Sequence, residues 1–361
     1  MCRVLPASAS AIQTAAAALQ HGELVAFPTE TVYGLGADAR NDAAVAAVYG
    51  LKGRPPTHPL IVHLADASEL WRWADRDAHA AHGVAPAAVE RLADEVWPGP
   101  FTMVVHAADT VSRLVTGGQD TVALRVPADP TARALLTAFA GAVVAPSANR
   151  FGRVSPTTAA HVADEFAGSD LLVLDGGATF WGLESAVIDL TTSAPRLLRP
   201  GARPVAALQD LVLRVVGSPL ERTGTAARST GVHVEAPGGG PGAGRAQATA
   251  PRAPGTLDQH YAPATPVRFA EPGDLQHVGD DVAVIARTPS PVAAPNGWWL
   301  TLPDDPEGFG KELYAALRTL DGVGARAILV EALPEGDEWL TVRDRLTRAA
   351  AAHTPLERLA R

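Results

Sequence analysis

Residues 236–255 consist almost wholly of Gly, Pro and Ala, interrupted by two arginines. Such a segment cannot bury apolar surface and behaves as a linker, so it divides the chain into two folding units. The length of 361 residues agrees with this division, because it is long for one compact domain and comfortable for two. The sequence therefore predicts a larger domain before the linker and a smaller one after Pro263.

The part before the linker alternates short apolar runs with Ala-rich or amphipathic stretches, as α/β proteins do. The alternation is not strict, which favours a mixed sheet over a doubly wound parallel one. The residues before Ser8 are expected to be disordered, and a helix capped near Ser8 or Ser10 should follow them. Asp42 and Ser155 are expected to cap two further helices, the second with Pro156 in its first turn. The expected strands cover residues 23–27, 59–64, 102–105, 121–126, 142–145, 171–174, 186–190 and 196–198, and further helices are expected over 86–96 and 130–139.

The part after the linker shows a second, smaller α/β pattern. Strands are expected over 281–286 and 327–330, with a helix between them and a closing helix over 337–352. Phe309, Leu313 and Leu317 recur at helical spacing and mark the buried face of the first helix. This part has no glycine-rich phosphate loop, so its residues alone do not indicate a function.

Charge and cysteine content narrow the class of protein. The net charge of -9 argues against a nucleic-acid interface spread over the whole surface, although a local cationic pocket remains compatible with it. The single cysteine, Cys2, excludes a disulfide framework and a Cys-based zinc site. No apolar run approaches the roughly 18 residues of a membrane span. We therefore expect a soluble cytoplasmic protein with no membrane partner and no strong direct nucleic-acid binding.

Residues 28–36, PTETVYGLG, run from a strand into a polar turn with two glycines, and Lys52 and Arg54 follow a short helix. Glycines allow backbone N–H groups to approach a ligand closely, and Lys and Arg suit nucleotide phosphates. The glycine spacing fits neither the phosphate loop nor the dinucleotide fingerprint. The segment could bind phosphate, or it could be an ordinary strand-to-helix turn beside a charge pair.

Polar side chains recur where the expected strands end, which is where α/β folds usually bind ligands. Arg54, Arg125 and Arg199 could each make bidentate contacts with phosphate or carboxylate. Alternatives stay open, since Arg125 could lie on a solvent face, His63 could be a hydrogen-bonded core residue and Ser155 could serve only as a cap. No Ser-His-Asp order, metal-ligand spacing or isolated carboxylate dyad stands out. The residues alone predict an α/β enzyme or binder for a phosphate-bearing ligand, with candidate residues Thr29, Thr31, Lys52, Arg54, His58, His63, Thr121, Arg125, Ser147, Asn149, Ser155, Ser185 and Arg199.

Several segments together resemble the YrdC-like family. In the first part these are residues 28–36, KGRP at 52–55, PLIVH at 59–63, SAN at 147–149, SPT at 155–157 and ESAVID at 184–189. Further along, PG at 254–255, HYAP at 260–263, LY at 313–314, LR at 317–318, Asp321 and DRL at 344–346 resemble the long two-domain form of the threonylcarbamoyl-AMP synthases in this family. The resemblance implies an α/β fold: a YrdC-like twisted mixed sheet over 8–205, a linker over 206–265 with an ordered lid near 254–263, and a smaller Rossmann-like α/β domain over 266–361.

Such a resemblance implies an activity. The family makes L-threonylcarbamoyl-AMP from L-threonine, bicarbonate or CO2, and ATP, for the N6-threonylcarbamoyl modification of adenosine 37 in tRNA. A threonine carbamate would attack the α-phosphate of ATP and release pyrophosphate, with Mg2+ bridging the phosphates. Catalysis would rest on charge neutralisation and alignment, without a protein nucleophile. The implied downstream partner is the machinery that transfers the threonylcarbamoyl group to tRNA.

By position, the resemblance assigns Lys52 and Arg54 to catalysis and implies no protein metal ligand. The implied L-threonine-binding residues are Thr31, His63, Arg125, Ala145 and Ser185. The implied ATP-binding residues are Arg54, His58, Thr121, Ser147, Ser155, Arg199 and Tyr261, with His260 or Tyr261 folding over the phosphates as a lid. Two positions depart from the family pattern: His58 stands where Asn is usual, and Phe151 stands where a small polar residue is common.

Two other functions are known for similar domains. A carbamoyl-adenylate-forming enzyme of hydrogenase maturation contains a similar domain, but it would carry paired-Cys zinc fingers, which one cysteine rules out. A non-catalytic RNA-binding module would need a broad basic face with aromatic stacking platforms. The acidic balance and the 5% aromatic content weigh against that module.

Overall fold

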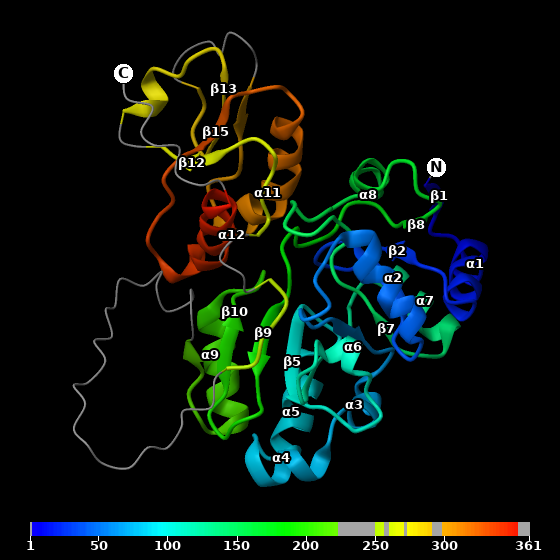
Figure 1. Cartoon of the computed structure of the whole chain (residues 1–361). Helices are drawn as coiled ribbons and strands as arrows, with labels where there is room; N and C mark the ends of the chain where they lie inside the picture. The colour runs from blue at the N-terminus through cyan, green and yellow to red at the C-terminus, as the bar shows by residue number, and fades with distance from the viewer. Residues whose placement is uncertain (1, 223–249, 256–259, 271–272, 291–297, 353–361) are drawn as a thin grey trace.

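The computed structural model describes residues 2–222, 250–255, 260–270, 273–290 and 298–352. Most of the predicted Gly/Pro-rich linker, residues 236–249, lies outside the described residues. The described chain builds a large sheet and a smaller one, with helices packed against both (Figure 1).

The strands before the linker join one sheet. Among the described residues, eleven strands follow the order β1-β8-β2-β3-β7-β4-β6-β5-β9-β10-β11. Strand β4 pairs with β6 in parallel whereas β5 pairs with β6 antiparallel, which confirms the mixed sheet predicted from the sequence. The strands are β1 Arg3–Pro6, β2 Val25–Phe27, β3 Gly34–Asp38, β4 Ile61–His63, β5 Phe101–His106, β6 Thr121–Arg125, β7 Val143–Val144, β8 Leu172–Asp175, β9 Ala186–Asp189, β10 Arg196–Arg199 and β11 Glu221–Arg222.

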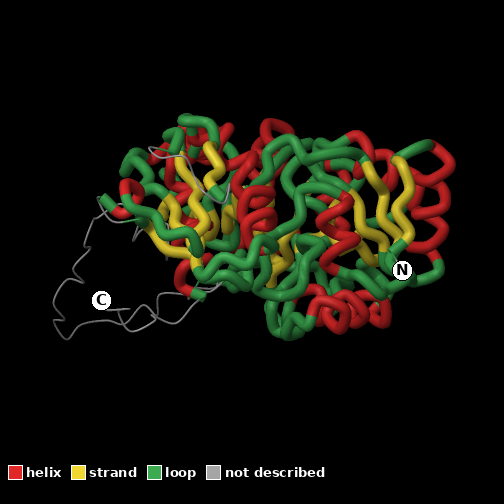
Figure 2. Tube along the Cα trace, turned by 90° about the horizontal axis from the view of Figure 1, so that it is seen from above, coloured by secondary structure: helices red, strands yellow, loops and turns green. Residues whose placement is uncertain are grey.

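Helices cover both faces of this sheet, because neighbouring residues of a strand point to opposite sides (Figure 2). The helices of this part are α1 Ala9–Gln20, α2 Asp42–Lys52, α3 Leu70–Trp73, α4 Arg76–His82, α5 Pro86–Val96, α6 Arg113–Thr116, α7 Pro130–Phe139, α8 Ala159–Glu165 and α9 Val205–Val216. In β7, Val143 belongs to the core under α1 and α7, and Val144 belongs to the larger core under α2, α5 and α9. Strand β11 and all of helix α9 but its first residue fall within the predicted linker range 206–265, and β11 extends the large sheet beside β10.

Local capping signals place the first two helices. The Ser8 hydroxyl accepts a hydrogen bond from the Ala11 N–H at 3.2 Å, so α1 begins where the sequence predicts. The cap of α2 is Asn41, one residue before the predicted Asp42, because its side-chain oxygen accepts from the N–H groups of Ala43 and Ala44.

Two other local predictions were wrong, each because of a long-range contact. The expected disordered start forms β1, which pairs in parallel with β8 at the edge of the sheet. Ser155 does not open a helix, because its hydroxyl donates to Glu184 at 2.6 Å. Helix α8 begins instead at Ala159, with Thr158 as its cap.

The part after the linker forms a four-stranded parallel sheet in the order β12-β15-β13-β14, as expected for a Rossmann-like α/β domain. Its strands are β12 Val267–Phe269, β13 Val282–Ala286, β14 Trp299–Thr301 and β15 Ala327–Val330, and its helices are α11 Pro306–Asp321 and α12 Leu340–Ala351. The two helices lie between this sheet and the larger domain (Figure 1). Val32, Val154 and Leu183 of the larger domain pack with Leu313 and Leu317 in one buried cluster. The two domains therefore share a continuous apolar core.

Candidate active site

One cavity lies where strand ends of the large sheet meet the end of α2 and the last part of the linker. Strands β4 and β6 are parallel and in register, so His63 and Arg125 lie side by side at their carboxyl ends. Lys52 and Arg54 flank Gly53, whose left-handed φ of 63° ends α2 and turns the chain toward the cavity. Most of the predicted site residues line this cavity: Thr31, Lys52, Arg54, His63, Arg125, Ala145, Ser147, Ser185, Arg199 and Tyr261.

Lys52 and Arg54 are buried cations, 3% and 7% exposed, and neither forms an ion pair with a described residue. The Lys52 ammonium donates to the carbonyls of Ser147 and Asn149, and the Arg54 guanidinium donates to the Pro59 carbonyl at 2.9 Å. Burial, followed by the charge of Arg54, holds the pKa of Lys52 well below its usual value. Burial also lowers the pKa of Arg54 to about 10, so Arg54 remains charged near neutral pH. The cavity thus carries positive charge that an anionic ligand can neutralise.

Arg125 is only 4% exposed, so the alternative that it lies on a solvent face is wrong. Its Nη2 atom donates to Glu30 Oε1 at 2.5 Å, and its Nε atom donates to the Gly99 carbonyl at 3.3 Å. Glu30 Oε2 in turn accepts from the Ala128 N–H at 3.0 Å. These bonds fix the plane of the guanidinium and leave Nη1 without a partner among the described residues.

Arg199 joins the cavity wall to the linker. Its Nη2 atom donates to the carbonyl of Ser185 at 2.9 Å and to the Ser185 hydroxyl at 3.1 Å. Its Nη1 atom donates to the Pro254 carbonyl at 2.8 Å. A phosphate that reached Nη1 of Arg199 would therefore compete with a linker carbonyl.

Several buried polar atoms around the cavity have no hydrogen-bond partner. Among the described residues these are His63 Nδ1, Asn149 Oδ1, His260 Nδ1 and the Tyr261 hydroxyl. Buried polar groups in proteins are almost always paired, so four such atoms on one cavity indicate a polar ligand. Burial and then the charge of Arg125 lower the pKa of His63 to about 3, so its imidazole is neutral at physiological pH.

The end of the linker lines this cavity with Pro254, Gly255, His260 and Tyr261. Tyr261 is 1% exposed and has a φ of 62°, a left-handed conformation that costs a non-glycine residue roughly 1–3 kcal/mol. At Gly255, which has a φ of 74°, a Cβ atom would lie 2.0 Å from the Tyr261 hydroxyl. The free cavity is about 50 Å3, whereas pockets for small molecules measure roughly 300–1,000 Å3. A nucleotide can therefore enter only when the linker end moves, which is consistent with the lid predicted near 254–263.

Three predicted ATP-binding residues do not line the cavity. The His58 ring packs against Phe151 with 5.4 Å between ring centroids, and Phe151 itself is a lining residue. Thr121 begins β6, at the opposite end of the strand from Arg125. Ser155 lies behind the lining residue Glu184, to which its hydroxyl donates. The binding roles of His58, Thr121 and Ser155 stay predictions.

Sequence reasoning missed the two carboxylates that organise the cavity, Glu30 and Glu184. Burial raises the pKa of Glu184, but the charges of Arg345 and Arg199 and its hydrogen bonds outweigh that effect and hold the pKa below its usual value. Glu30 lies in the motif at 28–36 and Glu184 in the motif at 184–189. A buried arginine commonly needs an acidic partner. A search for acidic partners of the arginines could therefore have identified Glu30 and Glu184, although no local pattern shows which arginines are buried.

In the described part of the chain, no group of three or more His, Cys, Asp or Glu side chains is arranged to hold a metal ion. No described helix combines the length and the apolar character needed to cross a membrane.

The chain matches two family models. Residues 17–201 match the family described as "Telomere recombination", and residues 216–351 match the family described as "Threonylcarbamoyl-AMP synthase, C-terminal domain". The first match covers most of the part that forms the large sheet, and the second covers the part that forms the small sheet.

Full-length relatives agree with these matches. The threonylcarbamoyl-AMP synthase of Pyrococcus abyssi is 37% identical over 352 residues, covering 94% of each chain. The synthase of Bacillus subtilis is 35% identical over 352 residues, covering 94% of this chain and 92% of its own. Among solved structures, that of P. abyssi Sua5 complexed with L-threonine matches with a TM-score of 0.79 at 35% identity, covering 98% of this chain and 97% of that one.

Proposed function

The chain belongs to the threonylcarbamoyl-AMP synthase family, and from this premise we propose that it converts L-threonine, bicarbonate or CO2, and ATP into L-threonylcarbamoyl-AMP and pyrophosphate. One observation carries the proposal. Lys52, Arg54, Arg125 and Arg199 surround a single cavity whose buried polar atoms lack partners. The L-threonine complex of the P. abyssi relative supports the choice of amino acid.

The reaction forms a C–N bond and an O–P bond, and it breaks an N–H bond and the bond from the α-phosphorus to the bridging oxygen. The threonine amine attacks the carbon of CO2 and loses a proton to water, which gives a carbamate. A carbamate oxygen then attacks the α-phosphorus of ATP, and the bond from that phosphorus to the bridging oxygen breaks, so that pyrophosphate leaves with the electron pair. Both reactants are anions, so the cations of the cavity lower the barrier by neutralising charge and holding the two in line.

The amino acid occupies the side of the cavity formed by β4, β6 and β9. Arg125 offers its free Nη1 atom to the threonine carboxylate while Glu30 keeps the guanidinium in place. The neutral His63 ring offers an unpaired Nδ1 atom as an acceptor or a donor. Thr31, Ser185 and the backbone at Ala145 complete this side.

The nucleotide phosphates occupy the side formed by α2, β7 and β10. Lys52 and Arg54 contact them, Ser147 lies beside Lys52, and Arg199 exchanges the Pro254 carbonyl for a phosphate oxygen. Tyr261 and His260 close over the phosphates after the linker has moved to admit them. His58, Thr121 and Ser155 remain proposed ATP contacts, reached when the cavity opens.

Mg2+ enters as part of the substrate, bound to the phosphates of ATP. The described residues offer no cluster of three potential metal ligands, and Mg2+ in nucleotide sites is commonly held by phosphates and water with few protein groups. The enzyme acts in the cytoplasm and passes its product to a separate transfer machinery for tRNA, without a strong RNA contact of its own.

Pyrophosphate release from purified protein tests the proposal. The complete mixture of L-threonine, bicarbonate, Mg2+ and ATP should release pyrophosphate, and omission of L-threonine should abolish the signal. Equal release without threonine or without bicarbonate would contradict the proposed reaction.

A further inference from the structure

The motif residues of the C-terminal domain have no part in the proposed reaction, yet they face the catalytic domain. Tyr314 and Arg318 lie on α11, and Arg345 lies on α12. Each has hydrogen-bond partners in residues 154–200 of the larger domain. These two helices lie between the small sheet and the larger domain (Figure 1).

Arg345 holds the carboxylate of Glu184. Its side chain is fully buried, and its Nε atom donates to Glu184 Oε2 at 2.8 Å. Its Nη2 atom donates to the Pro200 carbonyl at 2.9 Å, and its Nη1 atom donates to Asp344 at 2.6 Å. The guanidinium also lies over the ring of Tyr261, 5.0 Å from the ring centroid. One side chain of the C-terminal domain thus contacts two residues that line the cavity.

Tyr314 supports the same pair. Its hydroxyl lies 3.2 and 3.0 Å from the two carboxylate oxygens of Glu184, and its ring stacks on Tyr261 at 5.8 Å and 26°. Ser155 adds a further hydrogen bond to Glu184 at 2.6 Å. Glu184 is therefore held in one orientation, with its oxygen atoms engaged from behind the cavity.

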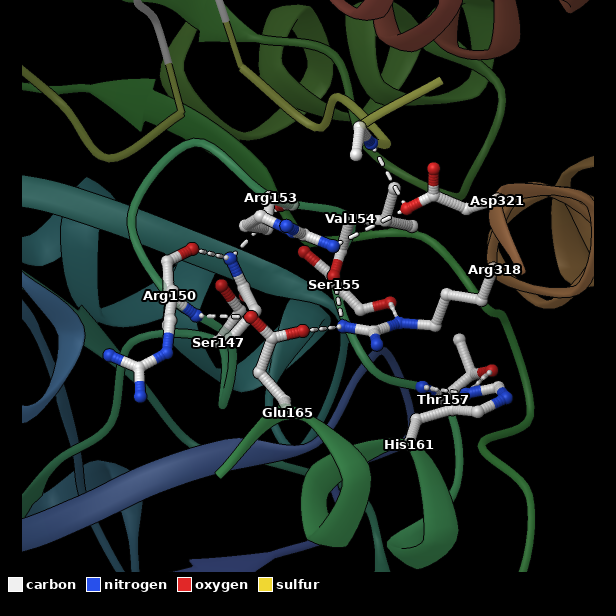
Figure 3. A network of polar contacts seen from close by, with 12 residues as sticks. Ser147, Arg150, Arg153, Val154, Ser155, Thr157, His161, Glu165, Arg318 and Asp321 are labelled. Carbon is white, nitrogen blue, oxygen red and sulfur yellow. Dashed lines mark hydrogen bonds and ion pairs between the residues drawn. The ribbon is translucent and has the colours of Figure 1, made fainter. Parts of the chain in front are cut away.

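Arg318 holds a backbone segment of the larger domain, as Figure 3 shows. It donates to the Val154 carbonyl and, at 2.9 Å, to Glu165 Oε2. Glu165 Oε1 accepts from the Arg150 N–H at 3.1 Å. Through these bonds, α11 fixes both ends of the segment 150–154.

This segment is continuous with the residues that hold the catalytic lysine. The carbonyls of Ser147 and Asn149 accept from the Lys52 ammonium, and the Phe151 N–H donates to the Lys52 carbonyl at 2.8 Å. A shift of Arg150 would therefore displace both the side-chain and the backbone partners of Lys52.

A cavity of about 560 Å3 lies beside this network, lined by Arg153, Arg318, Glu165 and Asp321. Arg153 pairs with Asp321 at 3.3 Å, and Arg318 pairs with Glu165 at 2.9 Å. Arg318 is thus neutralised by a carboxylate of the larger domain, and the two ion pairs join the two domains.

We infer that Arg345 and Arg318 are positioning residues of the nucleotide site. Arg345 holds the Glu184 carboxylate and the Tyr261 ring in the cavity wall, and Arg318 holds the segment that follows Ser147 and Asn149. The inference rests on the proposed function, because it assigns the nucleotide to this cavity.

Glu184 makes the inference testable, because it is a carboxylate on a cavity meant for anions. Without Arg345, Glu184 would lose the larger of the two positive charges that offset its burial, and only Arg199 would remain to serve both the carboxylate and the phosphates. Neutralising Glu184 in the same variant leaves Arg199 to the phosphates. Stability lost through the carboxylate would recover in the same way, so the KM for L-threonine distinguishes a loss of positioning at the nucleotide site from a general loss of the fold.

The test compares ATP binding and pyrophosphate release in Arg345→Met, Arg318→Met and the double variant Arg345→Met/Glu184→Gln. Arg345→Met should raise the KM and the Kd for ATP about tenfold or more, while the KM for L-threonine changes less than about threefold. The double variant should bind ATP about fivefold more tightly than Arg345→Met does. Arg345→Met should also be less impaired at pH 6 than at pH 8, because the loss of Arg345 raises the pKa of Glu184, against which only Arg199 and the hydroxyls of Ser155 and Tyr314 remain. Arg318→Met should lower kcat/KM for ATP about tenfold.

Arg326→Met is the matched control, because Arg326 forms an exposed pair with Asp281 elsewhere on the C-terminal domain at 2.8 Å. It should leave every parameter within about twofold. If Arg345→Met does not fold, Arg345→Lys keeps the charge but loses part of the hydrogen-bond set, and its KM for ATP should rise about threefold or more.

Unchanged ATP affinity in the folded Arg345 variant, or no relief from Glu184→Gln, would overturn the inference. The affinity measurements separate its failure from that of the proposed function. Wild-type protein that binds ATP but releases no pyrophosphate contradicts the function alone.

Discussion

Replacing Arg54 with Met should weaken ATP binding without destabilising the empty protein. Arg54 donates to the carbonyls of Pro59 at 2.9 Å and His58 at 3.4 Å and has no described carboxylate partner. Burial lowers its pKa from the usual value to about 10, which corresponds to a penalty of about 3 kcal/mol for holding the charge in the fold. This penalty is present at every pH below about 10, and so at neutral pH.

The substitution removes that penalty, and the two lost hydrogen bonds cost about 1 kcal/mol each. We therefore expect the free energy of unfolding of the empty protein to rise by about 1 kcal/mol. In the complex, charge-assisted bonds from Arg54 to phosphate contribute about 1.5–3 kcal/mol. Their loss should raise the Kd for ATP about 10- to 150-fold. The affinity for L-threonine should change much less, because Arg125 lies on the other side of the cavity.

Urea unfolding gives the stability, and titration calorimetry at pH 7.5 gives the Kd for ATP. Arg196→Met is an instructive contrast, because Arg196 contacts the fully buried Asp189 at 2.5 Å. Removing that cation leaves a buried carboxylate and should cost about 3–5 kcal/mol. The reasoning about Arg54 is refuted if Arg54→Met lowers the stability by more than about 2 kcal/mol, or if the Kd for ATP stays within about threefold of the wild-type value.

Three further outcomes are expected. Glu30→Gln removes the charged partner of Arg125. The free energy of unfolding should therefore fall by about 3 kcal/mol, and the KM for L-threonine should rise about tenfold. An unchanged KM would argue against Arg125 as the residue that binds the threonine carboxylate. Burial lowers the pKa of His63 to about 3 and that of His79 to about 4. Below about pH 6.5 the unfolded chain therefore takes up protons that the folded chain does not. The free energy of unfolding falls as the pH is lowered from about 6.5 toward these two pKa values. In urea unfolding, the free energy of unfolding of His63→Gln should fall by about 2 kcal/mol less between pH 7 and pH 5 than that of the wild type. An equal decrease in the two proteins would show that His63 does not titrate in this way. EDTA should abolish pyrophosphate release but leave the melting temperature of the ATP-free protein unchanged, whereas a lower melting temperature would indicate a resident metal ion.

Much of the fold and of the cavity followed from local patterns. Apolar runs located most strands, because a strand buried on both faces reads as a continuous hydrophobic segment. His63, Arg125 and Ser185 were found because ligand-binding groups in α/β folds gather at strand ends, and the structure brings them to one cavity. Tyr261, the proposed lid residue, was identified only through its motif.

What was missed depends on contacts between distant segments. Glu30 and Glu184 organise the cavity through Arg125 and Arg345, and no local pattern shows that these arginines are buried. Ser155 carries a valid helix-capping pattern, but a buried carboxylate takes its hydroxyl instead. Sequence patterns thus located the strand ends, whereas the partners of buried charges required the packed structure.

Mass spectrometry of the nucleotide product formed from 13C-bicarbonate, L-threonine and Mg2+·ATP tests the central claim most directly. If one cavity joins the amino acid to the nucleotide, the product contains AMP, threonine and one 13C atom, and pyrophosphate appears in equal amount. AMP or ADP without the label, or no new nucleotide in the complete mixture, would contradict the account.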